Sequence, residues 1–171
     1  MLGLHLDEIE IGLVAELGSY AFTRGNVLAF ARRFDPQPFH IDDEAAARGP
    51  FGKLAASGWH TAAGWMKCYV AANQRAEAAL KAQGKAPVPV GPSPGFTNLK
   101  WLRPVYPGDT VRYRSTVTGK RQLASRPGWG MVMSLNEGFN QHGELAFSFE
   151  GKVLTAMRST PLPQGEGGAQ A

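Results

Sequence analysis

A long apolar segment after residue 57 constrains the fold of this 171-residue sequence more than any other feature. Its large side chains recur at the spacing of one helix face: Trp59, Ala63, Met66 and Val70. Ser57 precedes them and can accept a hydrogen bond from a free amide of the first turn, as an N-cap does. The opposite side of the first turns, with Ala62 and Trp65, is hardly more polar. We therefore expect a helix that is buried nearly all round.

Segments with the alternating pattern of strands lie both before and after this helix in the sequence. Residues 13–22 predict a first strand, and the chain beyond residue 95 alternates between apolar and polar side chains, as half-buried strands do. The alternating apolar positions are Val111, Tyr113 and Val117 in one run, Trp129, Met131, Met133 and Leu135 in the next, and Leu145, Phe147, Phe149 and Val153 in the last. The turn 140–143 contains Gly143, which can take a positive φ. One buried helix and about five strands predict an α+β fold, an antiparallel sheet curled around the helix.

The remaining segments are short. Thr23 can cap a helix that ends near Asp35, because the residue before a proline is pushed away from the α region. The apolar side chains of this helix recur at helical spacing: Val27, Phe30, Ala31 and Phe34. Residues 42–49, rich in acids and alanine, predict one or two helical turns. Four prolines between residues 81 and 95 exclude regular structure there, so we expect an exposed loop.

Composition limits the class of protein. The length and a hydrophobic content of 43% fit one well-cored domain, and are too small for two of ordinary size. The net charge of +4 is modest, and no basic stripe interleaved with aromatic residues is present. We therefore expect no nucleic-acid partner.

One interval is nevertheless basic. Residues 110–136 contain no Asp or Glu, but they contain five cationic side chains: Arg112, Arg114, Lys120, Arg121 and Arg126. These side chains are typical of solvated strand faces. They could instead bind the phosphates of a substrate, and the sequence leaves both interpretations open.

Cysteine use and the apolar stretches bear on location. Cys68 is the single cysteine, so no internal disulfide can form, which fits a reducing compartment. The first residues carry acids where a secretory signal needs basic residues. The longest apolar stretch is interrupted by His60 and Lys67, which are costly in a bilayer. We expect a soluble, cytoplasmic protein without a membrane partner. No metal-ligand spacing or phosphate loop is present, so we predict no metal and no cofactor.

The segment FDPQPFH, residues 34–40, is the strongest candidate for chemistry. Its prolines restrict the backbone, so that the side chains of Asp35 and His40 can converge on one small volume. A neutral imidazole and a carboxylate can both accept hydrogen bonds from one water molecule and deprotonate it. The alternative is that Asp35 caps a turn and His40 packs, since Asp before Pro is common in turns.

Gly58 supports the first interpretation. It opens the core helix, where amide N–H groups lack intrahelical partners and favour developing negative charge. A glycine there lets a substrate carbonyl approach closely. It could also serve only to let the helix pack closely against the sheet. His60, in the same turn, could line a pocket or make a buried or intersubunit contact.

Two segments together resemble a known family. FARRFDPQPFHIDDEAAARGPFGKLAASGWHT, residues 30–61, and FTNLKWLRPVYPGDTV, residues 96–111, resemble the MaoC-like dehydratases, relatives of the (R)-specific enoyl-CoA hydratases. The shared pattern is an Asp, four residues, a His, an acidic alanine-rich turn, a Gly that opens the core helix, and a later Pro-Gly-Asp. The resemblance covers about residues 10–157. It implies the hot-dog fold, a long helix wrapped by an antiparallel sheet, and a homodimer or higher homo-oligomer. We accordingly expect one domain over residues 1–158 and a disordered tail over 159–171.

The resemblance also implies roles for single residues. Asp35 and His40 correspond to the family's catalytic pair, and the backbone N–H of Gly58 corresponds to the oxyanion donor for the thioester carbonyl. Two positions depart from the family pattern: Gln37 stands where Asn is frequent, and Ser57 where His is frequent. A serine found in some hydratases is replaced here by Met66.

The implied activity is reversible hydration of a 2-enoyl-CoA to a 3-hydroxyacyl thioester, with (R) configuration. Two alternatives belong to other classes. A hot-dog thioesterase typically uses a carboxylate of the core helix, but residues 58–73 contain none. A non-catalytic acyl-CoA-binding protein would tolerate loss of the pair, but both members are present.

Overall fold

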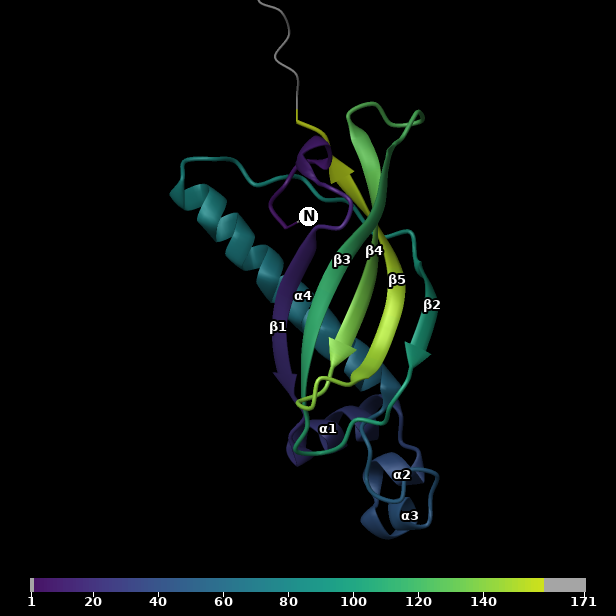
Figure 1. Cartoon of the computed structure of the whole chain (residues 1–171). Helices are drawn as coiled ribbons and strands as arrows, with labels where there is room; N and C mark the ends of the chain where they lie inside the picture. Colours follow the sequence, from purple (N-terminus) through teal and green to yellow (C-terminus); the bar gives the residue numbers. More distant parts are fainter. Residues whose placement is uncertain (1, 159–171) are drawn as a thin grey trace, which may run out of the picture.

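The computed structural model describes residues 2–158, in which a five-stranded antiparallel sheet wraps around one long helix (Figure 1). The strands are β1 (Val14–Ala21), β2 (Phe96–Trp101), β3 (Thr110–Gln122), β4 (Trp129–Phe139) and β5 (Leu145–Ala156). They pair in the order β1-β3-β4-β5-β2, so that β1 and β2 form the two edges. The predicted α+β class and the sheet curled around a helix are confirmed. The tail expected to be disordered lies outside the described residues.

The long helix is α4 (Gly58–Ala82), and it begins where the sequence indicates. Ser57 is its N-cap, with Oγ accepting a hydrogen bond from the N–H of Trp59 at 3.2 Å. The helix continues through Ala82, so the loop that we expected from residue 81 starts two residues later. None of the helices in residues 2–158 is both long and apolar enough to span a membrane.

The prediction that this helix is buried nearly all round is wrong for the single chain. Its inner side packs against the sheet, where Trp65, Cys68 and Ala72 are buried. Its outer side leaves large apolar side chains in solvent: Trp59 is 53% exposed, Met66 50% and Val70 45%. The physical reason is that one curved sheet can cover only one side of a helix.

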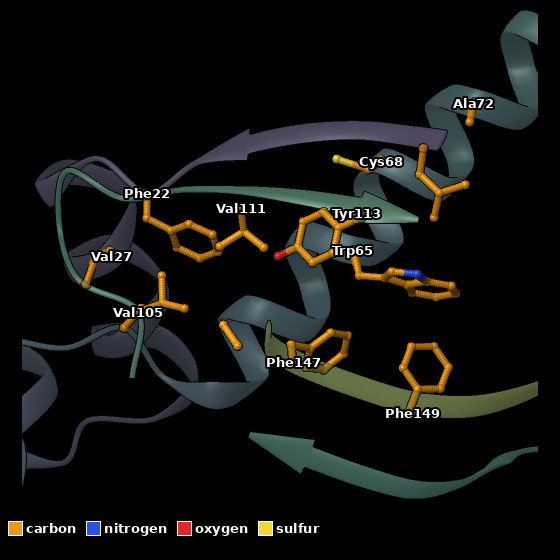
Figure 2. Packing of buried hydrophobic residues seen from close by; sticks show 13 residues of the cluster. Phe22, Val27, Trp65, Cys68, Ala72, Val105, Val111, Tyr113, Phe147 and Phe149 are labelled. Carbon is orange, nitrogen blue, oxygen red and sulfur yellow. The ribbon is translucent and has the colours of Figure 1, made fainter. Parts of the chain in front are cut away.

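The core lies between α4 and the concave face of the sheet (Figure 2). Tyr113 of β3 is fully buried, and its hydroxyl donates to the Thr61 carbonyl of α4 at 2.8 Å. Trp65 packs edge-on against Phe149 of β5, with ring centroids 4.6 Å apart. The burial of Val111, Tyr113 and Val117 confirms the face predicted from their alternation.

On β4 the apolar alternation does not mark the face toward α4. Asn136 pairs directly with Ser115 of β3, and both are buried on the concave face. Because successive side chains of a strand point to opposite faces, the residues at odd-numbered positions point outward, and these are the alternating apolar residues Trp129, Met131, Met133 and Leu135. Crowding by the core explains the small inward residues. A Cβ added to Gly138 would lie 2.8 Å from the ring of Tyr113.

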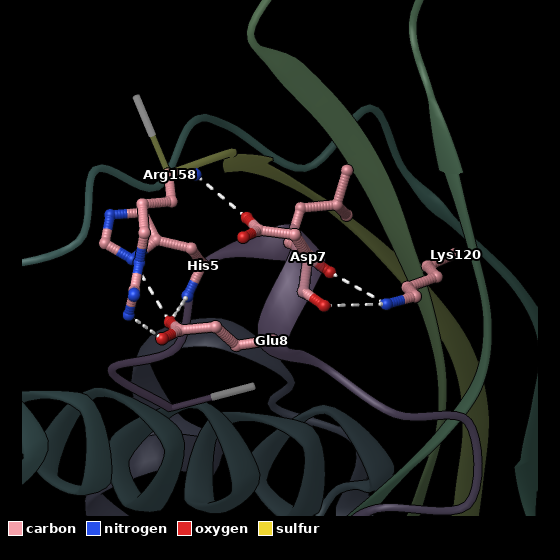
Figure 3. A network of polar contacts seen from close by, with 6 residues as sticks. His5, Asp7, Glu8, Lys120 and Arg158 are labelled. Carbon is pink, nitrogen blue, oxygen red and sulfur yellow. Dashed lines mark hydrogen bonds and ion pairs between the residues drawn. The ribbon is translucent and has the colours of Figure 1, made fainter. Parts of the chain in front are cut away.

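The start of the chain is fixed to the sheet by polar contacts (Figure 3). The 3₁₀ turn η1 (Leu6–Glu8) offers two backbone carbonyls to Lys120 of β3, whose Nζ donates to Leu6 at 3.1 Å and Asp7 at 3.3 Å. Arg158 donates its backbone N–H to Asp7 Oδ1 at 2.9 Å and pairs through its guanidinium with Glu8. Lys120, one of the five cationic side chains of the basic interval, therefore stabilises the fold by holding η1 against β3.

Three short helices, α1 (Arg24–Phe34), α2 (Pro38–Ile41) and α3 (Asp43–Ala47), gather beyond one end of the sheet, at the N-terminal end of α4 (Figure 1). Thr23 caps α1 as predicted, and Asp35 is its C-cap residue. The segment 36–41 is more regular than expected, because Pro38 occupies the first turn of α2, where its missing N–H costs nothing.

Candidate active site

The structure brings Asp35 and His40 together at the N-terminal end of α4. Asp35 Oδ2 lies 3.5 Å from His40 Nε2. The side chain of Asp35 is 17% exposed and that of His40 is 6% exposed. The carboxylate therefore reaches solvent, whereas the imidazole is enclosed by protein, with the rings of Phe39 and Phe51 beside it.

A backbone contact fixes the tautomer of His40. Its Nδ1 lies 2.8 Å from the carbonyl oxygen of Ala55. Because a carbonyl oxygen can only accept, Nδ1 must carry the hydrogen and donate it. In the neutral imidazole Nε2 is then a bare acceptor, and it faces the carboxylate of Asp35. Two acceptors that face each other need a shared hydrogen donor, which a water molecule can supply with its two hydrogens.

Two neighbours hold the Asp35 carboxylate in place. Ser57 Oγ donates to Oδ2 at 2.7 Å, and Gln37 Nε2 donates to Oδ1 at 2.8 Å. Burial raises the pKa of Asp35, but the hydrogen bonds from Ser57 and Gln37, together with the nearby His40, lower it more. The pKa therefore lies below the ordinary value, and the carboxylate stays ionised.

Sequence reasoning missed both of these contacts. It treated Ser57 as a helix cap and Gln37 as a departure from the family pattern. The residue types did give a signal. Gln37 is a polar residue two positions after Asp35, and Ser57 is a polar residue directly before the core helix, so that both could donate hydrogen bonds. The Ser57 contact spans 22 residues of chain. Only the folded path of the backbone reveals it.

Replacing Ser57 by alanine is expected to raise the pKa of Asp35 and to lower stability by about 0.5–2 kcal/mol through loss of the cap. A carboxyl whose folded pKa is depressed stabilises the fold above its unfolded pKa, and this contribution is lost as pH falls through the folded pKa. The stability difference between wild type and Ser57→Ala should therefore be largest near neutral pH and should shrink in acid. Thermal unfolding from pH 3 to pH 7, with ¹³C NMR of the Asp35 carboxyl, measures both effects.

Thr23→Ala is the matched control, because Thr23 Oγ1 also caps a helix, accepting from the N–H of Asn26 at 3.2 Å. Its stability loss should not depend on pH in this range. An unchanged carboxyl titration in Ser57→Ala would show that this hydrogen bond does not influence Asp35.

Gly58 directly follows Ser57 at the first position of α4. Within residues 2–158, its N–H makes no hydrogen bond to another backbone group. A Cβ at this position would lie 2.6 Å from Cε2 of Trp101, so that the indole ring occupies the space that a larger residue would need. Close packing therefore requires this glycine, and within residues 2–158 its own backbone N–H remains free to donate.

A cavity of about 220 Å³ runs along α4, between the helix and strands β2, β4 and β5. Trp59, the residue after Gly58, lines it, and Asn73 lines it farther along the helix. Its wall is largely apolar, with the aromatic rings of Trp65, Tyr69 and Phe149 among the lining residues. Asp35 and His40 do not line this cavity, which begins beside the helix turn that they face.

His60 belongs to the core rather than to the cavity. It is 3% exposed, stacks on Phe30 with centroids 4.6 Å apart, and has Nε2 at 3.3 Å from the hydroxyl of Tyr20. Burial lowers the pKa of His60 to about 4, so the ring is neutral at physiological pH. Of the interpretations left open by the sequence, the structure supports the buried contact.

The basic interval lies largely on the sheet face away from α4. Arg112 pairs with Glu16 at 3.3 Å, and Arg114 pairs with Glu137 at 2.9 Å. These two ion pairs favour the interpretation of solvated strand faces. In the described part of the chain, no three His, Cys, Asp or Glu side chains cluster closely enough to hold a metal ion.

Comparison with known proteins supports the resemblance. The profile of the MaoC-like domain family matches residues 15–128. The crystal structure of a MaoC-like dehydratase from Rhodospirillum rubrum is 33% identical, covers 92% of this chain and 100% of its own, and has a TM-score of 0.76. A double hot-dog protein from Mycobacterium tuberculosis, 19% identical over 94% of this chain and 46% of its own, shares the fold with a TM-score of 0.71.

One curated relative has a named activity. The mesaconyl-CoA hydratase of Cereibacter sphaeroides is 39% identical over 69 residues, which are 40% of this chain and 20% of that protein. The chain thus spans about a fifth of that relative's length. Taken with the hot-dog architecture, the family profile and the Rhodospirillum rubrum relative show that this chain belongs to the MaoC-like domain family.

Proposed function

We propose that this chain is a hydro-lyase that reversibly adds water to a 2-enoyl-CoA and gives a 3-hydroxyacyl thioester, with (R) configuration as the resemblance implies. One observation carries the proposal. Asp35 Oδ2 and His40 Nε2 lie 3.5 Å apart at the start of α4, where the amide of Gly58 has no backbone partner within residues 2–158. Membership of the MaoC-like domain family, together with the partial match to a protein named mesaconyl-CoA hydratase, supports it.

In the hydration direction, Asp35 and His40 orient a water molecule and remove its proton. The water oxygen forms a bond to C3 of the substrate while one of its O–H bonds breaks toward the pair. The electrons of the C2=C3 double bond move toward the thioester carbonyl, and C2 then takes up a proton from the pair, which offsets the proton that the pair removed from water. Water elimination is the same sequence in reverse.

Negative charge builds on the thioester oxygen during this step. The N–H of Gly58, at the positive end of the α4 dipole, is the candidate donor to that oxygen. General acid-base help is worth about 10²–10⁴ in rate and one oxyanion donor about 10²–10³. Together they lower the barrier by roughly 5.5–9.5 kcal/mol. Positioning of the substrate must contribute comparably, and the cavity along α4 is the candidate site for the acyl group.

A panel of 2-enoyl-CoAs of increasing chain length tests this function. Purified protein should remove the conjugated double bond, seen as loss of ultraviolet absorbance, and the 3-hydroxyacyl product should be (R) by chiral analysis. Release of free CoA without hydration would instead identify a thioesterase. Tight binding without turnover would identify a non-catalytic acyl-CoA-binding protein.

A homodimer is part of the proposal. The outer side of α4 exposes Trp59, Met66 and Val70, and the neighbouring edge strand β2 exposes Phe96 and Trp101. A contiguous apolar surface of this kind marks a protein interface in a soluble protein. An edge strand with unpaired backbone groups can also pair with a second sheet.

Val70→Asp is expected to shift the protein from dimer to monomer, because it places a charge in the middle of this apolar surface. Analytical ultracentrifugation measures the change. Ala79→Asp is the matched control, since Ala79 is exposed near the far end of the same helix, on the opposite side. A wild-type protein that sediments as a monomer at micromolar concentration would contradict the dimer.

A further inference from the structure

Three polar side chains form a hydrogen-bonded cluster on the concave face of the sheet, and two of them, Ser115 and Asn136, are buried, whereas Ser134 is half-buried. Ser115 Oγ donates to Asn136 Oδ1 at 2.7 Å, and Asn136 Nδ2 lies 3.2 Å from Ser134 Oγ. Ser115 is 1% exposed and Asn136 2% exposed. We call these three residues the polar patch. All three line the cavity along α4.

The polar patch is unusual for its surroundings. Most neighbours on the same face of the sheet are apolar, and Phe147, Phe149 and Val132 line the same cavity, with Thr155 as a further polar residue of the lining. Buried polar groups cost free energy unless they are fully hydrogen-bonded, so apolar residues would stabilise this core at least as well. Ser134 Oγ accepts from Asn136, and within residues 2–158 its own hydroxyl hydrogen reaches no acceptor. In an apolar pocket, a few convergent polar groups of this kind fix the orientation of a ligand.

The register of the helix gives the position of the polar patch along the cavity. Asn136 pairs with Phe149 across β4 and β5, and Phe149 packs on Trp65 of α4. Trp65 follows Gly58 by seven residues, a rise of about 10 Å along the helix. A ligand group at the polar patch thus lies about 10 Å farther along the helix axis than the amide that is the candidate thioester site.

We infer that the cavity selects acyl chains that carry a neutral oxygen function, a hydroxyl or keto group, near their distal end. This inference rests on the proposed function, and it names the substrate class. The apolar wall accepts the methylene groups, and the patch offers a hydroxyl donor and an amide to the distal oxygen. A neutral oxygen fits better than a carboxylate, because the three patch residues are uncharged and a buried carboxylate needs a cationic partner. Lys152 also lines the cavity, but it is exposed and pairs with Met133 on the outward face of the sheet.

The test compares trans-2-octenoyl-CoA with its 8-hydroxy derivative. Wild-type protein should hydrate the hydroxylated substrate with a kcat/KM about tenfold higher, the size expected for one well-placed hydrogen bond. Asn136→Leu, which is similar in volume, should abolish this preference. Crotonyl-CoA is too short to reach the patch, so its kcat/KM should change less than about twofold. Ser148→Ala is the matched control, since Ser148 of β5 points away from α4 and its loss should leave the preference intact.

Two further measurements keep the inference separate from the proposed function. Calorimetry with octanoyl-CoA and 8-hydroxyoctanoyl-CoA measures the same preference as a ratio of Kd values, without any turnover. If no enoyl-CoA is hydrated but the hydroxylated ligand binds about tenfold more tightly, the hydratase proposal fails and the patch assignment stands. Equal values for both ligands, in binding and in turnover, overturn the assignment and leave the hydratase intact. Ser134→Ala repeats the test if Asn136→Leu does not fold.

Discussion

Replacing Asp35 by asparagine is expected to lower kcat for 2-enoyl-CoA hydration by about 10²–10⁴, the range for loss of general acid-base help. The neutral amide keeps the size of the side chain but cannot hold the negative charge that makes a water molecule nucleophilic. It also replaces an acceptor with a donor, because the amide nitrogen would face either Ser57 or Gln37, both of which donate to Asp35 in the wild type. Stopped-flow loss of the enoyl absorbance, with substrate at saturation, measures kcat.

His40→Gln should cause a loss of similar size, since glutamine can reach the Ala55 carbonyl but offers no basic nitrogen. The double variant should lose little more than either single variant, because the two groups act on one water molecule as a unit. If the loss in the double variant instead equals the product of the two single losses, Asp35 and His40 have independent roles.

His142→Ala is the matched control for histidine loss, since His142 lies exposed in the turn between β4 and β5. It should keep wild-type kcat. Circular dichroism should show that all four proteins are folded. A folded Asp35→Asn protein with more than a tenth of the wild-type kcat would remove the pair from the chemistry.

The sequence predicts contacts that are close along the chain better than contacts that are far apart. Asp35 and His40 are five residues apart, and the intervening prolines limit how far their side chains can separate. By contrast, the contact between Ser57 and Asp35 depends on where α4 begins relative to α1, which no local pattern encodes. The cap at Ser57 was predictable from the residue type, whereas its second hydrogen bond was not.

The two faces of β4 illustrate a different limit. Alternation of Trp129, Met131, Met133 and Leu135 correctly predicts a strand, because period 2 is a local property. It does not identify the buried face, since both faces of this strand carry apolar groups. The buried face is decided by neighbours, with Tyr113 leaving room only for glycine at position 138. The polar patch was hidden for the same reason.

The exposed side of α4 shows how assembly limits prediction. The almost wholly apolar sequence of this helix indicates that all its sides are buried. Within one chain, only the side that faces the sheet is buried. If the proposed dimer forms, the expected burial is completed by a second copy. The pattern would then describe the assembly rather than the single chain.

Gly58→Ala is expected to lower kcat/KM for enoyl-CoA hydration by about 10²–10³, the range for loss of one oxyanion donor. The added methyl group would lie 2.6 Å from the ring of Trp101, and one of the two must move. Movement of the helix start displaces the amide of Gly58, and movement of the indole disturbs Trp59, which lines the cavity and whose ring lies 5.3 Å from that of Trp101. Either shift misplaces the donor relative to the thioester oxygen.

A double-mutant cycle with Trp101→Ala separates the clash from the other effects of alanine. Trp101→Ala alone removes the ring and leaves the glycine, so it measures what the ring contributes to substrate binding. If the clash displaces the amide, Gly58→Ala should cost much less in the Trp101→Ala background than in wild type, and the interaction energy of the cycle measures the difference. An equal loss in both backgrounds would show that the methyl group blocks the substrate itself. Full activity in Gly58→Ala would show that a precisely held amide at position 58 is not needed for the reaction.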